Sequence, residues 1–99
     1  MAWRDVDLEH LILAMNLCDE QGPTELRELL GFAPARKRHM HYPATDATRG
    51  PYEARVLIAV AHSLMFPDEP RLTPASYTGN GNQPQAFLVR LGFESRLIE

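Results

Sequence analysis

The hydrophobic positions are densest in one segment in the middle of the chain. Between residues 54 and 66, ten of thirteen residues are apolar, and only Arg55, His62 and Ser63 interrupt them. A helix that is apolar on nearly every side is a buried helix, and this run is too short to span a bilayer. The pattern therefore predicts a buried helix within the stretch 51–66, at the centre of a small core.

Arg55 and His62 share one stripe of this predicted helix. Positions seven apart differ by only about 20° around a helix. Because an unpartnered guanidinium is costly to bury, we expect the Arg55 stripe to face water, a carboxylate or an anionic ligand. Two interpretations stay open: an acidic partner together with a satisfied core histidine, or a functional groove.

Two amphipathic helices are predicted before this segment from apolar residues at helical spacing. Asp5 or Asp7 can cap the first helix, and Gly22 with Pro23 ends it. Its apolar face consists of Leu8, Leu11, Ile12, Met15 and Cys18. The second helix begins near Thr24, ends at Gly31, and is expected to bury Leu26, Leu29 and Leu30.

Short strands are predicted on both sides of a turn-rich segment. Residues 37–42 alternate as strands do, residues 43–50 have the composition of a turn, and residues 49–52 are expected to pair back as a short second strand. After the central helix we expect a capped turn at 73–76, a bend at 78–82, a helix over 83–91, and an edge strand over 93–98. The last of these helices is expected to face inward through Phe87, Leu88 and Leu91.

These elements define the expected fold class. It is a small, mainly helical α+β domain with about four helices around a buried central helix and a short two- or three-stranded antiparallel sheet. With 99 residues, 44% hydrophobic and 23% charged, one domain over 1–99 is expected. The single Cys18 forms no internal disulfide and is expected to be a small buried hydrophobe. No leader pattern is visible, so we expect a cytosolic protein.

Charge is distributed unevenly along the chain. The net charge of -3 and the pI near 5.8 argue against coating nucleic acid by bulk attraction. Residues 1–31 carry two basic and seven acidic groups, whereas residues 32–62 carry five basic and two acidic groups. The middle third is therefore a basic island that can attract phosphate.

Motifs for catalysis and metal binding are weak. His39 and His41 share a strand face near Asp46, but a third and a fourth ligand are missing, so no metal or other cofactor is expected. No serine or cysteine stands in a triad-like context, so no enzyme is expected. The glycine-rich bend at 78–82 is either an anion cradle followed by a helix start or an ordinary turn.

The basic island supplies the candidate site. Its cations can gather around the hairpin and the central helix as a footprint for a phosphate backbone, and tyrosines can add stacking surface. The candidate nucleic-acid-binding residues are Arg36, Lys37, Arg38, Arg49, Tyr52, Arg55, His62 and Asn80.

The order of several short motifs resembles a known family. The matching positions are Gly31-Phe32, Ala35-Arg36, Tyr52, Ala61-His62, Tyr77 with Gly79, and Leu91-Gly92-Phe93, with Arg55 where the family has lysine. Over roughly residues 5–95, the chain resembles the N-terminal head domain of McrA-type (ScoMcrA-like) modification-dependent HNH restriction endonucleases. Fuller relatives fuse this head to DNA-reading domains and an HNH nuclease. The resemblance implies a DNA-associated module in restriction or defence, and no cleavage activity is expected to transfer.

Together these observations predict a non-enzymatic DNA-binding or DNA-sensing module. The expected partners are DNA, with modified DNA as one alternative, and a second copy of the chain or a nuclease; no membrane is expected. The alternative function is a protein-interaction or regulatory adaptor. It would act through the acidic helical hairpin or through self-association at Trp3, which is otherwise a lid on the core. A third hypothesis is a small metal-dependent hydrolase that uses His39, His41 and His62.

Overall fold

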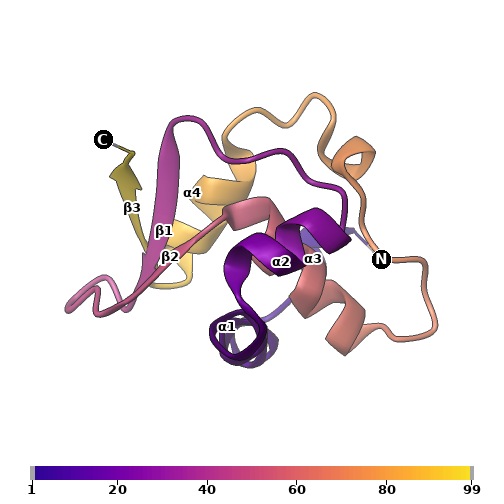
Figure 1. Cartoon of the computed structure of the whole chain (residues 1–99), viewed down its shortest axis with the longest axis horizontal. Coiled ribbons are helices and arrows are strands. Elements are labelled where there is room, and N and C mark those ends of the chain that lie inside the picture. Colours follow the sequence, from indigo (N-terminus) through magenta and orange to yellow (C-terminus); the bar gives the residue numbers. More distant parts are fainter. Residues whose placement is uncertain (1, 99) are drawn as a thin grey trace.

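The computed structural model describes residues 2–98 and contains four α-helices and one three-stranded sheet (Figure 1). The helices are α1 (Leu8–Gln21), α2 (Pro23–Leu29), α3 (Ala54–Met65) and α4 (Gln83–Arg90). The strands are β1 (Arg38–Tyr42), β2 (Arg49–Tyr52) and β3 (Glu94–Leu97). Two 3-10 turns, η1 (Trp3–Asp5) and η2 (Pro74–Tyr77), complete the fold. The predicted α+β fold class is confirmed.

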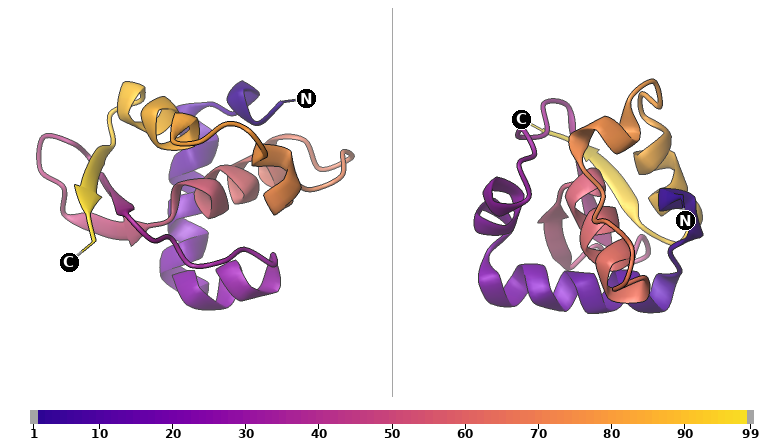
Figure 2. Two further views of the ribbon diagram at one scale, coloured as in Figure 1. Left: turned by 90° about the horizontal axis from the view of Figure 1, so that it is seen from above. Right: turned by 90° about the vertical axis from the view of Figure 1, so that its right-hand side faces the viewer.

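Helix α3 is the centre of the molecule, as its apolar sequence predicts. It crosses α1 and also packs against α4 and η1 (Figure 2). From Ala54 to His62, every residue of α3 except Arg55 is buried. A helix with neighbours on several sides can bury nearly its whole circumference, so this segment organises the core.

Helix α1 begins at a carboxylate cap. The Asp7 side chain accepts a hydrogen bond from the His10 backbone amide at 2.9 Å, which satisfies one of the free donors of the first turn. Asp5, the other candidate, instead accepts from the Ala2 amide within η1 at 2.8 Å. Cys18 is buried on the core face of α1, as predicted.

Helix α2 shows one error in the sequence-based prediction. Leu26 is buried and Leu30 is partly buried, but Leu29 is 68% exposed and does not join the core. Helix α2 has only seven residues and packs against α1, so it buries Leu26 but leaves Leu29, three positions further on, exposed to solvent. The prediction that Leu29 belongs to the buried stripe is wrong.

The sheet has the order β2-β1-β3, with both pairs antiparallel. It stands at one end of the molecule, and α4 lies next to β3 (Figure 1). Met40 and Tyr52 are paired across β1 and β2 and are both buried. The C-terminal strand β3 pairs with β1 and forms the predicted edge.

Gly50 allows β1 and β2 to approach closely. Its φ is 135°, and a Cβ atom at this position would lie 2.7 Å from the His41 Nδ1 atom. Both the backbone angle and the space therefore require glycine at this position.

Trp3 closes the core at the N-terminal end. Its ring meets Phe87 edge-on at 5.5 Å between centroids and lies 5.8 Å from Tyr77. Trp3 is buried, so it acts as a lid on the core. Within residues 2–98, no helix has the length and apolar character needed to cross a membrane.

Candidate nucleic-acid interface

A cleft of about 630 Å³ lies where three parts of the chain meet. Its walls come from the linker between α2 and β1, from the first turn of α3, and from the start of α4 with one residue of η2. The linker passes over α3 on its way to β1 (Figure 1). The lining residues are Phe32, Ala33, Pro34, Ala35, Arg36, Lys37, Arg38, Glu53, Ala54, Arg55, Val56, Pro74, Gly81, Asn82 and Gln85.

Four cations line this cleft. Arg36, Lys37 and Arg38 are exposed and follow one another at the end of the linker and the start of β1. Arg55 enters from the first turn of α3 and is half-buried. From the sequence, the five cations of the basic island are expected to gather; the structure brings these four side chains to one cleft, and Arg49 lies elsewhere.

Arg55 is held at the cleft by polar contacts that leave its charge uncompensated. Its Nη2 atom donates a hydrogen bond to the Gly81 carbonyl at 2.8 Å, and its guanidinium lies 5.8 Å from the Tyr77 ring centroid. Within the described part of the chain, no carboxylate forms an ion pair with it. The contacts orient the guanidinium, and its positive charge remains available to a ligand.

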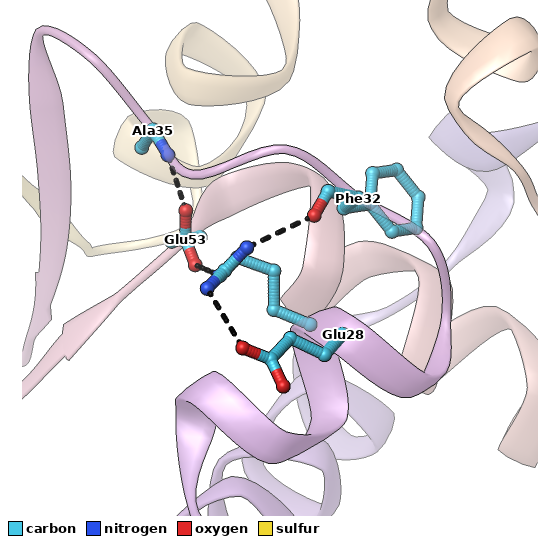
Figure 3. A network of polar contacts seen from close by, with 5 residues as sticks. Glu28, Phe32, Ala35 and Glu53 are labelled. Atoms are coloured by element: carbon cyan, nitrogen blue, oxygen red, sulfur yellow. Dashed lines mark hydrogen bonds and ion pairs between the residues drawn. The ribbon is translucent and has the colours of Figure 1, made fainter.

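Glu53 is the only carboxylate among the described residues that line the cleft, and it is already paired. Its Oε2 atom lies 3.3 Å from the Arg27 Nε atom, and its Oε1 atom accepts a hydrogen bond from the Ala35 amide (Figure 3). Arg27 also donates to the Phe32 carbonyl at 3.1 Å and approaches Glu28 at 3.7 Å. This network ties the linker to α2 and α3.

The network also determines the charge of the cleft. Arg27 and Glu53 are only 15% and 16% exposed, so water screens their attraction weakly. Since Arg27 lies outside the lining and neutralises Glu53, the four cations of the cleft face no unpaired carboxylate in its described lining.

Two helix N-termini border the same cleft. Residues Ala54 to Val56 form the first turn of α3, and Asn82 is the residue before α4. No side chain caps either helix through a hydrogen bond. The N-terminus of a helix carries free amide donors and partial positive charge, so both termini add to the attraction for an anion.

Arg49 and Tyr52 lie elsewhere in the fold. The Arg49 Nη2 atom donates hydrogen bonds to the Asp19 carboxylate at 2.6 Å and to the Asn16 side-chain Oδ1 atom at 3.0 Å, and the Asp19 hydrogen bond raises the pKa of Arg49. The Tyr52 hydroxyl donates to Asp19 at 2.8 Å. Burial, followed by this hydrogen bond, raises the pKa of Tyr52 to about 12. These contacts join β2 to α1, outside the cleft lining.

His62 and Asn80 are separated from the cleft to different degrees. His62 is 1% exposed, and its ring lies 5.0 Å from the Phe66 ring. Seven residues along a helix correspond to a rise of about 10 Å, so only the Arg55 end of the shared stripe reaches the cleft. Asn80 is half-buried, next to the lining residue Gly81, and accepts a hydrogen bond from Arg4 at 3.4 Å.

The sequence reasoning missed two features of the site. Gln85 lines the cleft from α4, and Arg27 neutralises Glu53 from a distance of 26 positions along the chain. No local pattern signals either contact. The glycine-rich bend at 78–82 was the one available signal for the α4 wall, and the structure places Gly81 and Asn82 there.

His39 and His41 are half-buried and lie on β1 on either side of the buried Met40. Burial, followed by the charge of Arg96, lowers the pKa of His41. In residues 2–98, no group of three or more His, Cys, Asp or Glu side chains is placed to hold a metal ion.

The geometry defines a small α+β domain with a basic cleft between a linker and two helix N-termini. The chain belongs to the family described as ScoMcrA-like, N-terminal head domain, whose model matches residues 4–96. The resemblance noted from the sequence is thereby confirmed, and it suggests a restriction-associated role for a module separate from the HNH nuclease domain. Neither a curated protein nor a solved structure matches the chain.

Proposed function

We propose that this chain is a non-enzymatic DNA-binding module of a restriction or defence system, and that its cleft holds phosphates of the DNA backbone. The convergence of four cations carries this proposal. Arg36, Lys37, Arg38 and Arg55 come together around a cleft whose one carboxylate is neutralised internally by Arg27. Membership of the head-domain family supports the link to restriction.

The cations have different roles in this proposal. The exposed linker cations attract the DNA and release its counterions when they bind. Arg55 is oriented by the Gly81 carbonyl and offers a planar guanidinium that suits phosphate oxygens. Phosphate contacts position a protein on DNA without reading its sequence. We therefore expect the cleft to bind DNA with little sequence preference.

The rest of the molecule restricts where DNA can approach. The chain has a net charge of -3, although the described cleft lining carries four cations and one paired carboxylate. The excess of acids therefore lies on other surfaces, including exposed positions of α1 and α2 such as Glu9, Glu20 and Glu25. DNA is repelled there and attracted at the cleft.

The test is the salt dependence of binding to short labelled duplexes by fluorescence anisotropy. Replacing Arg36, Lys37 and Arg38 with glutamine should lower the slope of log affinity against log salt by about 2 to 3, close to one unit per lost phosphate contact. The matched control replaces three arginines outside the cleft lining with glutamine: Arg71, Arg90 and Arg96.

The control variant has the same net charge as the cleft variant and should retain most of the wild-type slope. Equal losses in the two variants would show that only net charge matters, and an unchanged slope in the cleft variant would exclude this site. Duplexes with methylated bases or phosphorothioate linkages test for a preference for modified DNA. If no duplex binds at low salt, the adaptor hypothesis replaces this one.

A further inference from the structure

The cleft is larger and less polar than a phosphate site needs to be. Its volume of about 630 Å³ falls within the range of pockets that hold small organic ligands. Of the fifteen described residues that line the cleft, seven are apolar, including Phe32, Pro34, Val56 and Pro74. Phosphate contacts alone give no reason for an apolar surface of this extent, whereas a nucleotide base does.

Two polar atoms in the cleft walls also lack partners. The Arg55 Nε atom and the Gln85 Oε1 atom are buried, and neither has a hydrogen bond to a described residue. Leaving such groups unsatisfied costs about 1–3 kcal/mol each. Arg55 offers a donor, and the Gln85 amide offers both a donor and an acceptor. The edge of a base carries complementary groups.

Gln85 can reach a ligand at low cost. It is the third residue of α4 and is half-buried. It lines the cleft at the N-terminus of this helix, which attracts anions. Within the described residues, no hydrogen bond holds its amide oxygen in place. Turning this amide into the cleft therefore breaks no hydrogen bond of that oxygen, and it allows one to form with a ligand.

We propose that the cleft receives an unpaired nucleotide of a DNA strand. The cations hold its phosphate, and its base lies against the apolar lining beside Gln85. This inference rests on the proposed DNA-binding function and adds that the cleft prefers DNA with an unpaired nucleotide. In an intact duplex the bases are stacked and paired, and extruding one costs a few kcal/mol. A single strand or a bulged nucleotide avoids most of this cost.

The experiment compares three labelled DNAs at one low salt concentration: a perfect duplex, the same duplex with a one-nucleotide bulge, and the single strand. The wild-type protein should bind the bulged duplex about tenfold more tightly than the perfect duplex. Gln85→Ala removes the amide without changing charge. It should weaken binding to the bulged duplex about fivefold and leave binding to the perfect duplex and the salt slope unchanged.

Two further variants separate recognition from folding. Gln83→Ala changes the same type of residue at an exposed position of α4 outside the cleft lining, and it should keep the preference for the bulge. Ala33→Leu narrows the cleft from an exposed linker position and should weaken binding to the bulged duplex more than binding to the perfect duplex, so that the preference falls. Circular dichroism verifies that each variant is folded.

Equal affinity of the wild type for bulged and perfect duplexes would overturn this inference and leave the phosphate-binding proposal standing. A Gln85→Ala variant that keeps the full preference, together with an Ala33→Leu variant that also keeps it, would overturn it as well. Absence of binding to all three DNAs would overturn both proposals.

Discussion

The Arg27–Glu53 pair ties the linker wall of the cleft to α2 and to the start of α3, and Glu53→Gln is the sharpest perturbation of it. The substitution preserves size and keeps an acceptor for the Ala35 amide, but it removes the charge that faces the Arg27 Nε atom at 3.3 Å. Arg27 then remains 15% exposed without its main counter-charge.

The expected loss of stability follows from how deeply the Arg27–Glu53 pair is buried. Breaking a fully buried ion pair costs about 3–5 kcal/mol. Since both partners retain some contact with water, we expect the free energy of unfolding to fall by about 2 kcal/mol. For a domain of this size, that loss lowers the melting temperature by about 10 °C. Glu28→Gln is the matched control because Glu28 pairs with the same Arg27 at 3.7 Å but is 68% exposed. It should change stability by less than about 0.5 kcal/mol.

Circular dichroism gives the melting temperatures of both variants and of a double variant that combines Arg27→Met with Glu53→Gln. The double variant should recover part of the stability lost in Glu53→Gln, because no buried charge is left unpaired. If Glu28→Gln and Glu53→Gln lowered the melting temperature equally, burial would not be the reason. An unchanged melting temperature in Glu53→Gln would show that the pair does not hold the linker.

Three further predictions concern the core. Burial raises the pKa of Tyr52 to about 12 from a usual value of 10.0; stability from its neutral hydroxyl is therefore present below pH 10 and lost as the pH rises towards 12. Melting temperatures of the wild type should thus fall between pH 9 and pH 11.5, and Tyr52→Phe should show a smaller fall. Leu57→Ala should lower the free energy of unfolding, measured with urea, by about 2–5 kcal/mol because Leu57 is fully buried, whereas Leu29→Ala should lower it by less than about 0.5 kcal/mol. Similar losses in the two variants would contradict the packing described. Burial raises the pKa of the Cys18 thiol to about 11, so a thiol reagent at pH 8 should react slowly with the native protein and fully after denaturation, and rapid labelling of folded protein would disprove this.

Most of the elements could be predicted because their signals are local. The apolar run that became α3, the Gly22-Pro23 break and the alternation in β1 each depend on residues close together in the sequence. Leu29 shows the limit of this reasoning. Its spacing is that of a buried residue, but the length of α2 and the position of its neighbours decide how much of the helix is covered.

The candidate site could be predicted only in part. The run Arg36 to Arg38 and the position of Arg55 were visible as a basic island, and the structure places them around one cleft. Arg49 belongs to the same island, but it pairs with Asp19 because β2 lies against α1. Charge along a sequence does not show which carboxylates will be neighbours, and these neighbours decide which cations stay available.

By itself, the sequence determined the central helix, the flanking helices and strands, the family resemblance and the presence of a basic middle third, since hydrophobic period, turn residues and local charge are properties of neighbouring positions. Only the tertiary structure decided that Arg27 neutralises Glu53, that Gln85 lines the cleft, and that two helix N-termini meet there. These features join residues far apart in the chain, and burial and charge pairing between such residues are set by packing.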